Sequence, residues 1–154
     1  MAYASETSKL YADMIHGGSI AGVSYKEVLE DLTWQEATTK VDNCNTIATL
    51  VHHVQYYVRL VTRVLEGGPL EGNDAMSFKH SPVRSKDDWD QLRIQTWKEA
   101  ENFASLLKDL PDAKLLEPFE KYGTTYRNVH GIIEHTHYHL GQMNLLKKLI
   151  RTES

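Results

Sequence analysis

The chain of 154 residues has the length of one ordinary domain, which can bury a hydrophobic core without disulfides or a structural metal. Its net charge of -4 makes it a poor partner for nucleic-acid phosphates, and its single cysteine excludes a disulfide framework or a cysteine-rich zinc module. The unusual feature of the composition is eight histidines, four of them between positions 130 and 139.

The first residues show no basic stretch followed by an apolar core, as a secretory signal would. No apolar run approaches the ~20 residues that a transmembrane helix needs. Together with the single unpaired thiol, these observations lead us to expect a cytoplasmic protein with no membrane partner.

Apolar residues recur with a helical period in the first half of the chain. The first helical segment covers residues 5–31, and Gly17 and Gly18 weaken its middle, where we expect a kink or a break. The second segment covers residues 45–66 and has the clearest pattern, with two adjoining apolar stripes along one face. The Gly-Gly-Pro sequence at 67–69 is expected to end it.

Two further helices are predicted in the second half. A polar stretch over residues 69–84, rich in Gly, Asn, Asp, Ser and Pro, is interpreted as a long surface connection. The third helix is expected to begin at Ser85, a good N-cap, and to end at Pro111. The fourth is expected to begin near Thr124 or Thr125 and to end in basic turns that suit the helix dipole.

The sequence shows no convincing alternating strand pattern. Four helices of about 20 residues with one apolar face each predict an all-α fold, a four-helix bundle. We expect a single domain over residues 1–154.

Helical phase separates the two adjacent histidines of the second segment. His52 and His53 lie about 100° apart on a helix, so only one of them can face the interior. His53 is three residues after Leu50 and four before Tyr57, which places it on an inward line of side chains. His52 falls on a polar line that we expect to face solvent.

The same test on the fourth helix selects His135 and His139. They are four residues apart and stack on one face, which apolar side chains share. His137 points nearly opposite, along a polar line that also holds His130 and Glu134.

Three inward histidines on two helices form a candidate metal site. Two imidazoles at i, i+4 are half of a common metal-binding pattern, and neutral imidazole suits zinc, copper, iron or nickel. With His53 as the third nitrogen ligand, a fourth position stays open, which is typical of catalytic and not of structural sites. Inward histidines can also be core groups that hydrogen-bond to their neighbours, and spacing alone leaves both interpretations open.

Two segments of the sequence resemble the DinB-like (DinB/YfiT) superfamily. Residues 46–54, Thr-Ile-Ala-Thr-Leu-Val-His-His-Val, resemble the second-helix segment that ends in the family's first ligand histidine. Residues 135–142, His-Thr-His-Tyr-His-Leu-Gly-Gln, match the family's His-x-x-x-His-x-Gly-Gln motif. The resemblance covers nearly the whole chain and implies a four-helix bundle, commonly a homodimer, with a divalent metal (zinc, nickel or iron) held by His53, His135 and His139.

The resemblance also implies a class of activity. Characterised members include transferases and isomerases that use low-molecular-weight thiols such as bacillithiol or mycothiol, and a metal would lower the pKa of such a thiol. Our first hypothesis is therefore a metal-dependent thiol S-transferase, or a related small-molecule transferase or hydrolase. The second is a stress-response or binding module with a structural or vestigial metal, and the third is a metal-free dimeric scaffold.

Several residues near the predicted site are candidates for supporting roles, while the reactive group is expected to be a metal-bound water or thiol. Gln142 lies one turn beyond His139 and can hydrogen-bond to a ligand, or it can serve close helix packing. Tyr57 lies one turn beyond His53 and lines either the pocket or the core. Asn128 is a weaker candidate for the pocket mouth.

Other chemically reactive side chains are expected to lie apart from the site. Glu134 should point away from it and is not favoured as a general base. Cys44 precedes the second helix, about 13 Å along the axis from His53, and is expected to be an ordinary thiol. His16 and His80 fall at the glycine-rich break and in a loop, where we expect them to be solvated.

Overall fold

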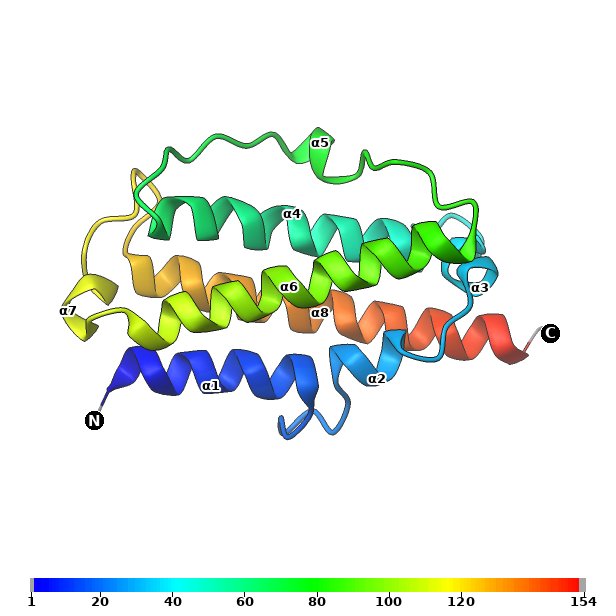
Figure 1. The fold of residues 1–154 in the computed structure, drawn as a ribbon, viewed down its shortest axis with the longest axis horizontal. Helices are drawn as coiled ribbons and strands as arrows, with labels where there is room; N and C mark the ends of the chain where they lie inside the picture. Colours follow the sequence, from blue (N-terminus) through cyan, green and yellow to red (C-terminus); the bar gives the residue numbers. More distant parts are fainter. Residues whose placement is uncertain (1, 153–154) are drawn as a thin grey trace.

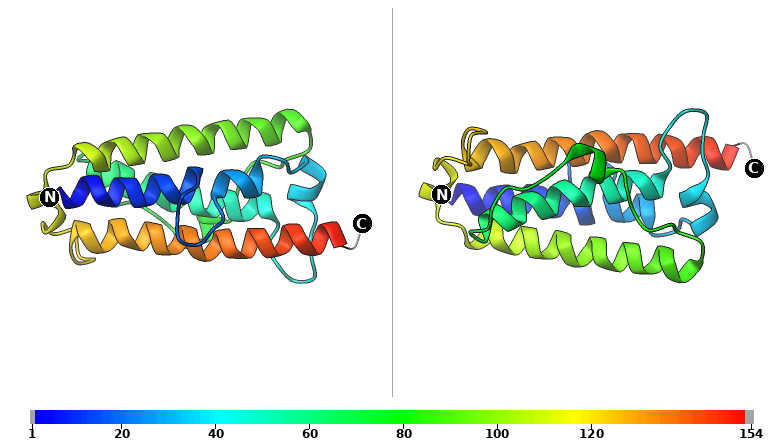
Figure 2. Two further views of the ribbon diagram at one scale, coloured as in Figure 1. Left: turned by 90° about the horizontal axis from the view of Figure 1, so that it is seen from below. Right: turned by 90° about the horizontal axis from the view of Figure 1, so that it is seen from above.

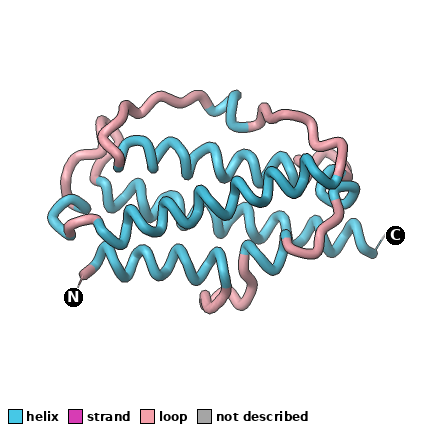
Figure 3. Tube along the Cα trace, in the orientation of Figure 1, coloured by secondary structure: helices cyan, strands magenta, loops and turns pink. Residues whose placement is uncertain are grey.

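The structure is a computed structural model that describes residues 2–152. These residues form helices and no strand, which confirms the all-α prediction (Figure 3). In chain order the helices are α1 (Tyr3–His16), α2 (Tyr25–Leu29), α3 (Trp34–Thr38), α4 (Ile47–Leu65), α5 (Asp74–Ser77), α6 (Lys86–Asp109), α7 (Asp112–Leu115) and α8 (Thr125–Thr152).

The long helices lie side by side in a bundle (Figure 1). Helix α4 and the pair α1 and α2 occupy opposite corners, and α6 and α8 lie on the two flanks between them (Figure 2). Helix α1 packs chiefly on α6, whereas α4 packs on both α6 and α8. The α4–α8 contact brings the predicted metal ligands together.

The predicted break in the first helical segment is confirmed. Gly17 has a φ of 119° and Gly18 a φ of 108°, a backbone conformation that residues with a Cβ rarely adopt. Helix α1 therefore ends at His16, and the chain resumes a helix only at α2. There Ser24 and Glu27 form a capping box, in which each side chain accepts a hydrogen bond from the other residue's backbone N–H.

The other predicted helix ends also agree with the structure to within two residues. Thr46 caps α4 by accepting a hydrogen bond from the Thr49 N–H, and Gly67, with a φ of 87°, follows its last turn. Ser85 caps α6, and α8 begins at Thr125.

The core is built from the inward faces of the long helices. Tyr11 of α1 and Phe103 of α6 meet edge to face with ring centroids 4.8 Å apart, and neither is accessible to solvent. The indole of Trp89 is buried and donates a hydrogen bond to the Leu32 carbonyl, which fixes the start of α6 against the α2–α3 connection. None of the helices within residues 2–152 combines the length and the apolar character that crossing a membrane requires.

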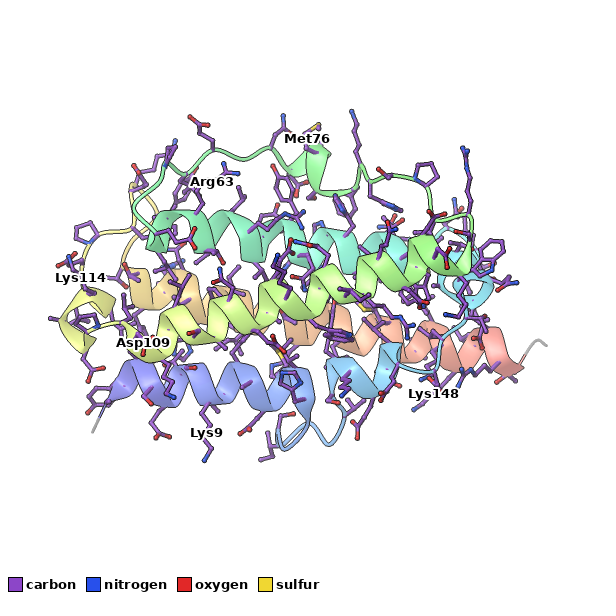
Figure 4. The ribbon with its side chains drawn as sticks, in the orientation of Figure 1. Lys9, Arg63, Met76, Asp109, Lys114 and Lys148 are labelled. Atoms are coloured by element: carbon purple, nitrogen blue, oxygen red, sulfur yellow. The ribbon has the colours of Figure 1, made fainter. Side chains whose placement is uncertain are left out.

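Residues 69–84, which we call the cover segment, do more than connect two helices. The segment passes over the outer face of α4 and carries the one-turn helix α5 at its crest (Figure 1). In α5, Met76 points away from the bundle (Figure 4), whereas Ser77 is completely buried. The sequence prediction of a plain surface connection is therefore incomplete, because one turn of helix is too short to show a hydrophobic period.

Candidate metal centre

Two helices bring three imidazoles to one point. Helix α4 supplies His53, and α8 supplies His135 and His139 from successive turns. The Nε2 atom of His135 lies 3.1 Å from Nε2 of His53 and 3.1 Å from Nε2 of His139. The ligand nitrogens of the three all lie within 4.8 Å of one another, so one ion could be held by the whole set. The structure thus brings together the three histidines that helical phase selected.

The cover segment sets the tautomer of His53. The Ser77 hydroxyl donates to the Asp74 carbonyl at 2.6 Å, so its oxygen is the acceptor in the 2.7 Å contact with Nδ1 of His53. His53 therefore carries its proton on Nδ1 and presents a lone pair at Nε2. Both Ser77 and His53 are buried, which shields this hydrogen bond from water.

Gln142 sets the tautomer of His139 in the same way as Ser77 sets that of His53. Its Oε1, which can only accept, lies 2.7 Å from Nδ1 of His139, while its Nε2 donates to the Tyr138 hydroxyl at 3.2 Å. The proton of neutral His139 is thus on Nδ1, and its Nε2 lone pair points at the other two rings. Of the two roles that the sequence left open for Gln142, the structure shows the hydrogen bond to a candidate ligand.

The arrangement of donors fits a metal ion. Nε2 of His53 and Nε2 of His139 both face Nε2 of His135 with lone pairs, and one ring proton on His135 can satisfy only one of them. At least one short nitrogen–nitrogen contact is therefore repulsive in the neutral protein, and a cation between the three lone pairs would remove the repulsion. Nδ1 of His135 is buried and has no hydrogen-bond partner among residues 2–152, so no protein acceptor orients this ring.

Burial keeps the three imidazoles neutral. It lowers the pKa of His53, and the neighbouring His139 lowers it further. The pKa of His135 falls to about 4, because of burial first and then the proximity of His139 and His53. Burial also lowers the pKa of His139. Neutral imidazole is the form that binds metals, so all three are ready to ligate at neutral pH.

Aromatic rings enclose the triad on the side of the cover segment. Phe78 stacks on His53 with ring centroids 4.1 Å apart, and Tyr57 lies edge-on to His53 at 5.3 Å and to His135 at 4.9 Å. The Tyr57 hydroxyl donates to Asp74 at 2.5 Å. Burial and this hydrogen bond raise the pKa of Tyr57 to about 12, so it keeps its proton.

The prediction that His52 faces open solvent is wrong, as is the expectation that His80 is simply solvated. Both are half-buried where the cover segment lies on α4, and their ring centroids are 5.3 Å apart. His80 donates from Nδ1 to the Ser81 carbonyl and accepts at Nε2 from the Thr49 hydroxyl, at 2.8 and 2.9 Å. The helical phase of His52 was correct, but a pattern within one helix does not show that residues 69–84 would cover this face of α4.

A cavity of about 590 Å³ adjoins the triad between α4 and α8. Tyr57 and His135 line the end nearest the metal site, which is one of the two positions that the sequence left open for Tyr57. Asn128 lines the cavity farther along α8, as its position in the sequence suggested. Glu134 is exposed but also lines the cavity, which corrects the expectation that it points away. Asp74 was missed altogether, because only the Asn73 cap, which accepts from the Ala75 N–H, marks α5 in the sequence.

The remaining predicted bystanders lie outside the triad. Cys44 is an exposed free thiol before α4, and His16 is exposed at the end of α1. His137 and His130 are half-buried on other faces of α8, where the His130 ring contacts Tyr126.

Comparison with protein families agrees with the helical fold. The family model of the DinB superfamily matches residues 24–143, which include all three histidines. The chain belongs to the DinB superfamily. Searches of curated proteins and of solved structures returned no match.

Proposed function

We propose that the protein binds one divalent metal ion through His53, His135 and His139 and acts on a small molecule in the adjoining cavity. The observation that carries the proposal is the convergence of three neutral imidazole nitrogens, two of which have their lone pairs directed inward by hydrogen bonds on Nδ1. Zinc, nickel and iron(II) all accept such a set of donors. Three protein ligands leave a position free for a substrate.

The reaction class that we propose is thiol-dependent transfer. A divalent metal would act as a Lewis acid that lowers the pKa of a thiol or a water. In the transfer, the sulfur forms a bond to an electrophilic carbon, the leaving group departs with the electron pair of the broken bond, and the thiol proton passes to solvent. The chain itself orients His53 and His139, excludes water on one side with Phe78, and offers the cavity walls to the substrate.

A structural metal that joins α4 to α8 is the second candidate. The stacked Phe78 and the buried Ser77 favour it, because they close one side of the triad. The cavity that reaches His135 and Tyr57 favours chemistry, because a small molecule has room beside the ligands. The two candidates differ in whether an added thiol can reach the metal.

Metal content tests the ligand set. Protein purified without an affinity metal should contain about one divalent ion per chain by elemental analysis. His139→Ala should abolish binding, whereas His137→Ala, on the same helix but outside the triad, should retain it. A His139→Ala variant that kept its full metal content would refute the assignment.

Thiol access tests the reaction class. Adding 2-mercaptoethanol to the cobalt(II)-substituted protein should produce a sulfur-to-cobalt charge-transfer absorption if the open position accepts a thiol. An unchanged spectrum would favour the structural role. With thiol access shown, consumption of a test electrophile that depends on both metal and thiol would establish the transferase.

A further inference from the structure

The cavity beside the triad extends well beyond the histidines. Its volume of about 590 Å³ lies within the range of roughly 300–1,000 Å³ that small-molecule sites occupy. It is lined by both α4 and α8, from His135 to the first turn of α8 at Arg127. These two residues are eight positions apart on one helix, which corresponds to about 12 Å along the axis. A ligand that fills the cavity is therefore elongated.

The middle of the cavity is apolar. Leu60 and Val61 of α4, Ile132 of α8 and Phe119 of the preceding loop line it, and all four are buried in the bundle. These walls have no charged group to offer to the body of a ligand. The long axis of the cavity therefore suits an apolar chain or ring system.

One cationic side chain lines the end of the cavity far from the triad. Arg127 is the cationic side chain among the residues that line this cavity, and its guanidinium takes part in no ion pair within residues 2–152. A guanidinium presents paired N–H donors that match the two oxygens of a carboxylate. One such group balances the single negative charge of one carboxylate.

The acidic side chains of the cavity are poorly arranged for a cationic ligand. Asp74 already accepts the hydrogen bond of Tyr57, and Glu134 is the neighbour of His135, at the triad end of the cavity and not at the end where Arg127 lies. At the far end, Nζ of Lys121 lies 5.4 Å from the centre of the Tyr122 ring, so the aromatic face that could attract an ammonium group already has a cation.

We infer that the cavity binds an elongated monocarboxylate, with its carboxylate on Arg127, its apolar body between α4 and α8, and its other end at the histidine triad. The inference rests on the proposed function where it names a substrate class, since the reactive end of the molecule would lie at the metal ligands. Binding of the carboxylate end needs no metal, so the two proposals can fail separately.

Three probes with the same alkyl chain length and different head groups test which head-group charge the cavity prefers. Octanoate, octanol and octylammonium are titrated calorimetrically into the full-length protein as purified, and again after a chelator has removed the metal. Octanoate should bind about tenfold more tightly than octanol, as expected for one charge-assisted hydrogen-bonded pair. Octylammonium should bind most weakly. Equal or tighter binding of octylammonium would overturn the inference.

Arg127→Gln tests whether this side chain binds the carboxylate. It should reduce the affinity for octanoate about tenfold, to that of octanol, and leave the affinity for octanol unchanged. Lys148→Gln is the matched control, because it removes the same charge from the same helix at a side chain that points away from the bundle (Figure 4). Equal losses in the two variants would show a general effect of net charge and refute the role of Arg127.

Substitutions at two glycines of α8 test whether the probes bind in this cavity. Gly131 lines the cavity, and a Cβ built on it meets no atom within 4 Å, so the leucine side chain of Gly131→Leu should extend into the cavity and partly fill it. Gly141 has equally open surroundings but lies outside the cavity lining. Gly131→Leu should weaken the binding of octanoate and of octanol to the same extent, and Gly141→Leu should leave both affinities unchanged. Unchanged binding in Gly131→Leu would place the probes elsewhere and overturn the inference.

If the protein proved to hold no metal, the proposed function would fail while the preference for octanoate could still be measured in the same sample. If the metal bound as proposed and octanoate showed no preference over octanol, only the inference about the carboxylate would fail.

Discussion

Ser77→Ala removes the hydroxyl that joins the cover segment to His53. The Ser77 side chain accepts from Nδ1 of His53 at 2.7 Å and donates to the Asp74 carbonyl at 2.6 Å, and the residue is completely buried. The variant keeps nearly all of the side-chain volume. Its effect therefore reports chiefly on the hydrogen bonds of this hydroxyl.

This geometry sets the expected loss of stability and the expected loss of zinc affinity in Ser77→Ala. In the metal-free protein, the Nδ1–H of His53 would lose its acceptor while still buried, which costs about 1–3 kcal/mol of unfolding free energy. Partners that orient a metal-bound histidine typically contribute 10- to 100-fold in affinity, or about 1.4–2.7 kcal/mol. The dissociation constant for zinc should therefore rise by about 10- to 100-fold in Ser77→Ala.

Chelator competition measures the metal affinity, and urea unfolding of the metal-free protein measures the stability. Ser81→Ala is the control, because Ser81 is exposed on the same segment. Helical circular dichroism should match the parent in both variants. A zinc affinity within threefold of the parent, combined with a clear loss of stability, would show that Ser77 anchors the cover segment without orienting His53 as a ligand.

Three further predictions test other parts of the structure. Gln142→Leu should weaken zinc binding by about 10- to 100-fold, because Nδ1 of His139 loses its acceptor; equal affinity in chelator competition would argue against this orientation. Phe103→Ala should lower the unfolding free energy by about 3–5 kcal/mol in urea titrations, because it opens a void in the core. Lys147 and Arg151 hold the pKa of Asp31 below its usual value, so the contribution of this carboxylate is complete above about pH 4 and is lost as the pH falls through the lowered folded-state pKa. Arg151→Gln should therefore lower the free energy of unfolding by less than about 1 kcal/mol at pH 7, because the Arg151–Asp31 ion pair is partly exposed. A difference in unfolding free energy between variant and parent that grew as the pH was lowered would contradict this prediction.

The long helices and the inward histidines could be predicted from the sequence. Helical period is a local property, since each side chain's direction follows from its position in a 3.6-residue turn. Counting along that period separated His53 from His52 and placed His135 and His139 on one face. Caps at Thr46 and Ser85 and the glycines after α1 and α4 marked the helix ends for the same local reason.

The distribution of charge along the cavity needed the tertiary structure. Arg127 and Glu134 lie on α8, whereas Asp74 belongs to the cover segment, and nothing in their spacing shows that one cavity joins them. Packing of α4 against α8 creates that cavity, and the loop before α8 closes part of it with Phe119. Helical phase places Glu134 away from the histidine pair, but the phase of one helix does not show a cavity that forms between two helices.

The sequence by itself therefore determined an all-α chain with three histidines on the inner faces of two helices. Only the tertiary structure decided that their ring nitrogens meet, and that Ser77 and Phe78 of the cover segment enclose one of them. The physical reason is range. The geometry of a helix is local, because it repeats from turn to turn. The path of a polar loop depends instead on contacts with distant parts of the chain. Ser77 hydrogen-bonds to His53, which lies 24 residues earlier in the chain.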